Sequence, residues 1–161
     1  MKSKLALILY PNTHGIGFVV CESEKNIIDF GLKPINRKTQ KEYLNKAKWL
    51  IEYATPDIIL VLDYKGAVTK ISKRQEAIIN DITEHARDHG MNIRHYSRRQ
   101  IKEVFSDFKA TCKHDIAMTL IRWYPQLGSR EPHKRLAYMS EHYQMGVFDA
   151  FALMITHYYL S

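Results

Sequence analysis

The period of the hydrophobic pattern changes along this chain, and that change restricts the folds that it can adopt. Three short apolar runs come first, separated by turns, over residues 5–9, 16–21 and 26–32. Runs of this kind predict three β-strands in an antiparallel meander. From residue 37 the apolar side chains recur at helical spacing, and a continuous apolar run over 58–62 interrupts that spacing. Such a run is typical of a strand that is buried on both faces of a sheet.

Helical and strand patterns alternate through the rest of the chain. The spacing predicts helices over 37–53, 74–89, 99–105, 113–124 and 145–159, and a short strand over 91–96. This order indicates an α/β fold with a mixed five-stranded sheet, three strands antiparallel and the rest parallel, and helices on both faces. Because no repeat, low-complexity tract or linker divides the sequence, we expect residues 1–161 to form a single domain.

The charge composition favours a polyanionic partner. The 161 residues include 24 Lys and Arg against 17 Asp and Glu, a formal net charge of +7 at pH 7. This excess suits nucleic acid, and a merely basic cytoplasmic protein is the alternative. Cys21 and Cys112 do not make a disulfide framework, and no apolar stretch reaches membrane-spanning length without a charge. We therefore expect a cytoplasmic protein with reduced thiols and no membrane contact.

Two carboxylates occur where a charge needs an explanation. Asp149 lies in the apolar run of the last predicted helix, and Asp63 directly follows the run at 58–62. A charge on a packed helix face costs free energy unless it is paired or binds a metal, whereas the helix dipole would favour an acid in the first turn. Asp63 either lies at the sheet edge where α/β folds bind ligands or simply begins a turn. If the fold brings Asp63 and Asp149 close together, their carboxylate oxygens are suitable ligands for Mg²⁺ or Mn²⁺.

Five segments, in order along the chain, carry a resemblance to a known family. Residues 9–20 match a turn of Asp-Pro-Gly followed by Gly and a hydrophobic strand, and residues 56–63 match a strand that ends in an acid. Residues 96–102 match the pattern Tyr-x-Pro-x-x-Val-Lys, and Lys113 follows Lys102 by eleven residues, as in the family. Residues 149–157 match Asp-Ala-Leu-Ala with a trailing His. In these segments the chain resembles the RuvC-type Holliday-junction resolvases of the RNase H-like superfamily, nearly from end to end. The resemblance implies an RNase H-like fold.

The resemblance also implies a catalytic site that this chain retains only in part. The family cuts branched DNA with two divalent ions held by four carboxylates. Carried over to this sequence, the four positions are Tyr10, Asp63, Gly146 and Asp149, so two acids remain. Tyr10 is a poor Mg²⁺ ligand because a phenol is neutral at working pH, and Asp63 lies one residue later after its proline than the family pattern requires. Asp63, Asp149 and Lys113 are the catalytic candidates, with at most one Mg²⁺ or Mn²⁺ bound by the two acids.

Basic and aromatic residues near these segments are the predicted nucleic-acid contacts. They are Tyr64, Lys73, Arg74, Arg98, Arg99, Lys102 and Lys113, with a further group at Arg130, Lys134 and Arg135 before the last helix. Phosphate contacts of this kind give salt-dependent affinity without sequence preference, and Tyr64 is the candidate to wedge between unpaired bases. The resemblance further implies a homodimer, which would suit a two-fold symmetric junction.

Three functions remain open at this point. The favoured one is a RuvC-like protein that binds branched DNA, or structured RNA, with a depleted metal site that argues against catalysis. The alternative is an active Mg²⁺- or Mn²⁺-dependent structure-selective endonuclease, a Holliday-junction resolvase that uses a modified carboxylate site. The third and weaker one is a protein-interaction domain whose basic surface is incidental.

Overall fold

A mixed five-stranded sheet forms the centre of the molecule. The computed structural model describes residues 4–65, 69–132 and 144–161. The strands are β1 (Ala6–Pro11), β2 (Gly15–Ser23), β3 (Asn26–Pro34), β4 (Ile58–Asp63) and β5 (Asn92–Ser97). They lie in the order β3-β2-β1-β4-β5, with β2 antiparallel to β1 and β3, and with β4 parallel to β1 and β5. The predicted α/β class and sheet are confirmed.

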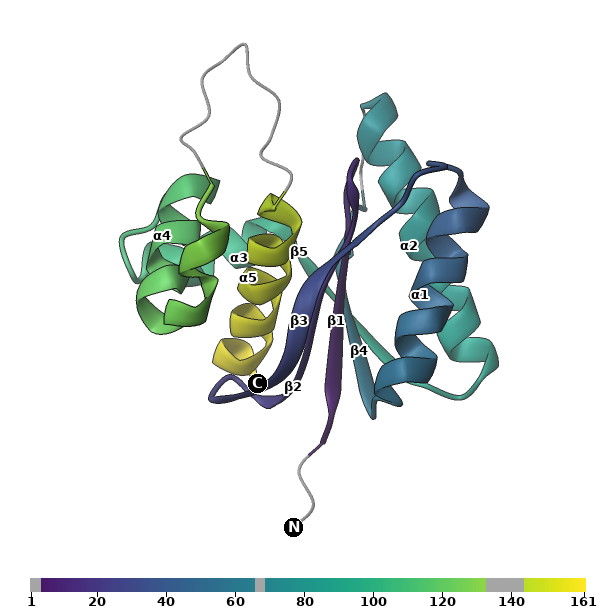
Figure 1. The fold of residues 1–161 in the computed structure, drawn as a ribbon, viewed down its shortest axis with the longest axis horizontal. Helices are drawn as coiled ribbons and strands as arrows, with labels where there is room; N and C mark the ends of the chain where they lie inside the picture. The colour runs from purple at the N-terminus through teal and green to yellow at the C-terminus, as the bar shows by residue number, and fades with distance from the viewer. Residues whose placement is uncertain (1–3, 66–68, 133–143) are drawn as a thin grey trace.

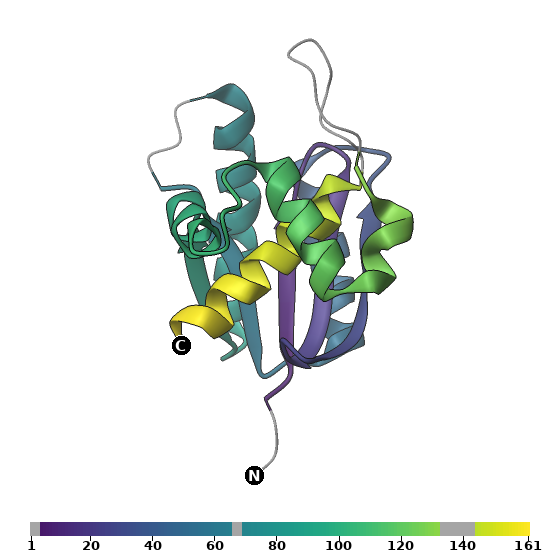
Figure 2. The ribbon, with the colours of Figure 1, turned by 90° about the vertical axis from the view of Figure 1, so that its left-hand side faces the viewer.

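Helices cover both faces of this sheet (Figure 1). On one face lie α1 (Gln40–Ala54) and α2 (Lys70–Asp88), and on the other lie α3 (Arg98–Ser106), α4 (Lys113–Trp123), the 3-10 helix η1 (Pro125–Arg130) and α5 (Met145–Leu160). Figure 2 shows α5 running obliquely across the sheet, with α4 packed on its outer side. No helix in the described part of the chain is long and apolar enough to cross a membrane.

Side chains of β1 and β4 alternate between two hydrophobic cores, one on each face of the sheet. Leu9 and Val61 belong to the core under α1 and α2, whereas Ile8, Leu60 and Leu62 belong to the core under α5. This alternation follows from the two-residue repeat of an extended strand. It therefore determines on which face a residue at the end of either strand lies.

The start of α2 differs from its predicted position. The helix begins at Lys70 rather than at residue 74 because Thr69 caps it. The Thr69 hydroxyl oxygen accepts a hydrogen bond from the Ser72 amide at 3.0 Å, and the Ser72 side chain accepts one from the Thr69 amide at 3.2 Å. Such a reciprocal pair satisfies two amides that would lack partners at a helix start. The cap places Lys70 and Lys73 in the first turn of the helix.

Candidate functional site

Asp149 lies in α5 beyond the first turn of the helix, on the side packed against the sheet. The helix begins at Met145 and has no acidic residue in its first turn, so an effect of the helix dipole at its start does not account for Asp149. The residue is 3% exposed. A buried carboxylate of this kind requires compensating charge or hydrogen bonds.

Two basic side chains supply that compensation. Nζ of Lys113 lies 3.2 Å from Oδ2 of Asp149, within hydrogen-bond distance, and Nη1 of Arg98 lies 3.7 Å from Oδ1. The Lys113 ammonium also lies 6.0 Å from the centre of the Tyr10 ring. The carboxylate is therefore held by positive charges from two other helices, beside the ring that occupies the end of β1.

Both cations are the first residues of their helices. Arg98 begins α3, where the Ser97 hydroxyl caps the Gln100 amide, and Lys113 begins α4, where Cys112 caps the amide of Asp115. The positive end of the helix dipole disfavours a cation at a helix start. Asp149 offsets that penalty in the folded protein, and two helix starts and two cations together make this part of the sheet edge electropositive.

Close packing between α5 and β2 determines how near Asp149 comes to the sheet. A Cβ atom on Gly17 would lie 2.1 Å from the carbonyl oxygen of Gly146, and a Cβ atom on Gly146 would lie 2.7 Å from Nδ2 of Asn12. The first distance is to backbone, so glycine is needed at position 17, whereas the second is to the end of the Asn12 side chain, which would have to shift. The first turn of α5 is thereby held against the end of the β1–β2 hairpin.

Asn12 occupies the space that a side chain at position 146 would need. Its Oδ1 accepts hydrogen bonds from the amides of His14 at 2.8 Å and Gly15 at 3.1 Å, which close the β1–β2 turn. The Tyr43 hydroxyl donates to the Asn12 carbonyl at 2.5 Å. These bonds hold the amide of Asn12 next to Gly146, so a side chain at position 146 would require Asn12 to move.

Asp63 lies on the opposite face of the sheet from Asp149. Leu62 belongs to the core under α5, so by strand alternation Asp63 turns toward α2. There it lines a hollow together with Glu76 and His95, and its Oδ1 accepts a hydrogen bond from the amide of Lys65 at 2.8 Å. The structure does not bring Asp63 and Asp149 together, and the β4 residue that faces α5 at this edge is Leu62.

Comparison with known proteins rests on structure rather than on sequence. No protein-family model matches the chain, and no curated protein sequence matches it. The RuvC of Thermus thermophilus in complex with a Holliday junction substrate superposes with a TM-score of 0.63 at 14% identity, over 98% of this chain and 94% of that chain. A second structure of Thermus thermophilus RuvC gives 0.64 at 15% identity, over 97% and 95%. The yeast mitochondrial Holliday junction resolvase Ydc2 gives 0.60 at 8% identity, over 96% and 80%.

This chain has the RuvC fold. The agreement extends over nearly the whole chain and confirms the RNase H-like arrangement expected from the sequence. On this fold, the ligand positions carried over from the family can be compared with what surrounds Asp149. Tyr10 and Leu62 end β1 and β4 on the α5 face, and Gly146 lies one turn before Asp149.

The residues around Asp149 do not fit a pair of divalent ions. Hard cations require several oxygen ligands. Within the described part of the chain, the family's other ligand positions on this face are occupied by a phenol, a leucine and a glycine, and two cations engage the one carboxylate, that of Asp149. Among the described residues, no group of three or more His, Cys, Asp or Glu side chains is placed to hold a metal ion. No step of a reaction is therefore assigned to a metal here.

The other predicted contacts are spread over both faces. Lys102 is exposed on α3, and Arg99 forms an exposed ion pair with Glu103 at 3.2 Å. Lys73 and Arg74 line a hollow on the α1 and α2 side. Tyr64 is half-buried and packs against both cores, and Arg130 lies 5.5 Å from the ring centre of Phe30. Lys134 and Arg135 lie outside the described residues.

His157 forms a buried contact within the core. Its Nδ1 lies 2.7 Å from the Tyr96 hydroxyl, and burial lowers the pKa of the imidazole below its ordinary value. Along α5, it lies about 12 Å from Asp149 at the rise of an α-helix. The trailing histidine of the sequence pattern therefore supports the packing of α5 on β5.

Two features of the site are not predicted from the sequence. The guanidinium of Arg98 faces Asp149 although 51 positions separate them, and Asn12 fills the space beside Gly146 from a hairpin turn. Arg98 is predicted as a DNA contact from its position in a basic group, not as a partner of an acid. The sequence does contain one cue for Arg98, because this residue occupies the position of the proline in the family pattern. A charged guanidinium therefore replaces an uncharged ring at this position.

Proposed function

We propose that this protein binds branched DNA at the sheet edge around Asp149 and that it does so without cleaving the strand. The observation that carries the proposal is the contact of Asp149 with Lys113 and Arg98. These residues supply positive charge at the sheet edge, in a fold that is also found in a RuvC bound to a Holliday junction substrate. In this proposal, the positive charge that attracts DNA comes from Lys113 and Arg98 and not from a metal ion.

Both cations are suited to receive phosphate groups. The side chain of Lys113 is 33% exposed and that of Arg98 is 25% exposed. Nη1 of Arg98 is buried without a hydrogen-bond partner among the described residues, and its 3.7 Å approach to Asp149 is too long for a hydrogen bond. The exposed parts of the two side chains can present positive charge to a phosphate group. The net charge of +7 adds long-range attraction.

The same arrangement disfavours hydrolysis. In-line displacement with two metals needs carboxylates that hold both ions about 4 Å apart. A single acid that neutralises Lys113 and Arg98 cannot supply that ligand set, and Asp63 faces the other side of the sheet. Lys102 and Lys113 then serve as phosphate contacts rather than as groups that stabilise a transition state.

A metal-dependent endonuclease is the second candidate, and the observation that favours it is the buried carboxylate of Asp149 itself. To act in this way, the protein would have to release Asp149 from its cations and recruit a second acid when DNA binds. A homodimer would present two such edges to a symmetric junction, and light scattering of the free protein and of the complex would measure the subunit number.

Fluorescence anisotropy with EDTA present tests the binding proposal. A labelled four-way junction should bind more tightly than a linear duplex of the same composition, and the affinity should fall linearly on a log scale as salt rises. Lys113→Gln should lower the affinity and reduce the salt slope by about 1. Arg98→Gln should have a similar effect.

A matched control separates a local contact from a loss of total charge. Lys25 is exposed in the turn between β2 and β3, at the other end of the sheet, so Lys25→Gln removes one positive charge away from the site. It should leave the salt slope close to that of the unmodified protein. Equal binding of junction and duplex, or equal effects of Lys25→Gln and Lys113→Gln, would contradict the proposal.

A further inference from the structure

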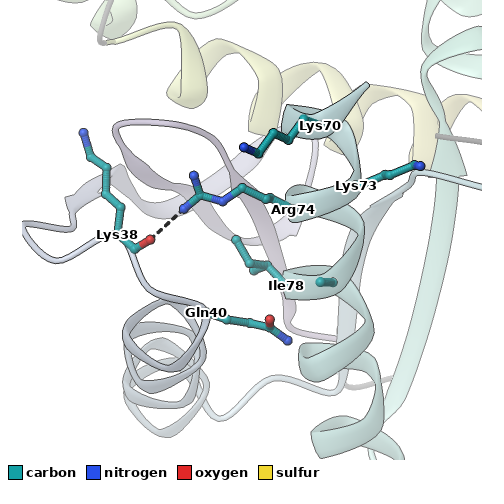
Figure 3. A pocket seen from close by; sticks show the side chains of 7 residues that line it. Lys38, Gln40, Lys70, Lys73, Arg74 and Ile78 are labelled. Carbon is teal, nitrogen blue, oxygen red and sulfur yellow. Dashed lines mark hydrogen bonds between the residues drawn. The ribbon is translucent and has the colours of Figure 1, made fainter. Parts of the chain in front are cut away.

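A basic hollow lies between the beginnings of α1 and α2, on the face of the sheet away from Asp149 (Figure 3). Its volume is about 490 Å³. Four basic side chains line it together with Gln40, and Ala77 and Ile78 form its apolar part; the basic ones are Lys38, Lys70, Lys73 and Arg74. No acidic residue lines the hollow among the described residues.

The electrostatics of the α2 start are unfavourable without an anion. The first turn contains no acidic residue, and Lys70 and Lys73 lie there beside the positive end of the helix dipole. Arg74 follows directly, and its Nη2 donates a hydrogen bond to the Lys38 carbonyl at 2.8 Å. This bond fixes the guanidinium at the hollow and joins α2 to the segment before α1. Arg74, held by this bond, together with the flexible lysines of the first turn, is suited to hold a phosphate at this helix start.

A second, independent feature adjoins the hollow. Gln75 is 7% exposed, and its Oε1 is buried without a hydrogen-bond partner among the described residues. It lines a smaller hollow of about 60 Å³ that shares Lys38, Arg74 and Ile78 with the larger one. An unsatisfied buried amide costs free energy, and the two ends of a glutamine amide can exchange places to donate or to accept. A ligand that carries both a phosphate and a polar group beyond it would satisfy both features.

The smaller hollow reaches the hairpin that borders the Asp149 site. Thr13 and Tyr43 line it, and the Tyr43 hydroxyl donates to the carbonyl of Asn12, whose amide lies against Gly146. The β1–β2 turn thus separates the two sites at the edge of the sheet. A strand that passes over this turn can contact both.

We propose that the hollow binds one nucleotide unit of a nucleic-acid strand, with its phosphate on Lys70, Lys73 and Arg74 and its sugar or base hydrogen-bonded to Gln75. The path of the strand rests on the proposed function, whereas the nucleotide site does not. A nucleotide free in solution offers the same chemistry, and the experiment separates these two sources.

Two titrations test the site. Deoxyadenosine 5′-monophosphate is added to the protein and backbone amide signals are followed by NMR; the signals of Lys70 to Gln75 should shift, and deoxyadenosine without phosphate should leave them unchanged. The Lys70→Gln/Lys73→Gln double variant should lose these shifts. With a labelled single strand, the double variant should reduce the salt slope of binding by about 2.

Control variants make each outcome decisive. Lys25→Gln/Lys46→Gln removes two exposed charges that do not line the hollow, and it should retain both the shifts and the slope. Gln75→Leu should weaken strand binding without changing the slope. Nucleotide shifts without a change in the slope for strands would assign the site to free nucleotides and overturn the proposal, as would identical behaviour of the two double variants. If the protein bound junction and duplex equally well, but Lys70→Gln/Lys73→Gln still removed the nucleotide shifts and reduced the salt slope, the proposed function would be refuted. The nucleotide site would remain supported.

Discussion

The ammonium group of Lys113 lies 3.2 Å from the carboxylate of Asp149. The first residue of α4 thus neutralises a buried acid of α5, and Arg98 approaches the same carboxylate from α3. In a metal site, an acid in this position would share a cation with other acids. Here the cations belong to the protein. The contact therefore links the stability of the α3–α4–α5 layer to the charge of the surface that we propose binds DNA.

Replacing Asp149 should affect stability and DNA binding in opposite directions. Asp149→Asn keeps the size of the side chain but removes the negative charge that Arg98 and Lys113 both face. Because both cations are partly exposed, we expect a loss of roughly 1–3 kcal/mol in the free energy of unfolding, measured by urea denaturation. The affinity for a four-way junction should rise, because no carboxylate then competes with phosphate.

An exposed acid provides the control for that variant. Asp88 lies at the end of α2, away from the site, and Asp88→Asn adds the same net charge. It should leave stability and junction affinity nearly unchanged. If both variants raise the affinity equally, the effect belongs to total charge and not to the release of Lys113 and Arg98.

The contact between β2 and α5 should be highly sensitive to a single methyl group. Gly17→Ala would place Cβ 2.1 Å from the Gly146 carbonyl oxygen, so that the helix has to move. We expect a loss of about 3 kcal/mol or more in stability. Gly128→Ala in η1 is the matched control, because its Cβ would meet nothing within 4 Å. Comparable melting temperatures for the two variants would show that α5 does not lie as close to β2 as described.

Two histidines, the buried His157 and the half-buried His95, should make the protein less stable below neutral pH. Burial lowers the pKa of His95 and His157 below the ordinary value of 6.5. Below pH 6.5 the unfolded chain therefore binds protons that the folded protein does not, so the free energy of unfolding should fall as pH drops through 6.5 and should level off below the folded pKa values. Urea denaturation on either side of that pH measures the slope.

Substitution of His95 and His157 tests whether these residues cause the pH dependence of the free energy of unfolding. His95 contacts the Thr83 hydroxyl at 2.9 Å and His157 contacts the Tyr96 hydroxyl, so each substitution by Gln should cost some stability at neutral pH. The slope below pH 6.5 should become smaller in each variant and smallest in the double variant. An unchanged slope in the double variant would attribute the pH dependence to other groups.

The two cysteines should differ sharply in reactivity. Cys112 is exposed at the start of α4, whereas Cys21 is buried, and burial raises the pKa of its thiol to about 11. Because the thiolate is the reactive form, a thiol reagent should modify Cys112 in the native protein and Cys21 only after unfolding. Mass spectrometry of the modified peptides distinguishes them. Rapid modification of Cys21 in the native state would contradict its place in the core.

The order of elements could be predicted from the sequence because each one carries its own local pattern. The continuous apolar run at 58–62 and the helical spacing in 145–159 both correspond to observed elements, β4 and α5. That Asp149 needs either a partner or a metal could also be predicted, because a charge in an apolar helix costs free energy otherwise; which of the two it has could not. These inferences depend only on neighbouring residues.

The face of the sheet on which Asp63 lies could not be predicted from the sequence as reliably as the order of helices and strands. A shift of one residue in a strand moves a side chain to the other face, and the proline-to-acid spacing already differs by one residue from the family pattern. The contact of Arg98 with Asp149 and the position of Asn12 beside Gly146 could not be predicted either, because both arise from tertiary packing. The basic hollow arises in the same way, because Lys38 and Arg74 meet only when α1 and α2 lie side by side.

A cleavage assay on a labelled four-way junction tests the central claim most directly. Purified protein is incubated with the junction in Mn²⁺, in Mg²⁺ and in EDTA, and the strands are separated under denaturing conditions while binding is followed in parallel. We expect a stable complex of similar affinity in all three solutions and no cut strand in any of them. Mn²⁺- or Mg²⁺-dependent cutting that Asp149→Asn abolishes would contradict this expectation and would establish Asp149 as a metal ligand instead.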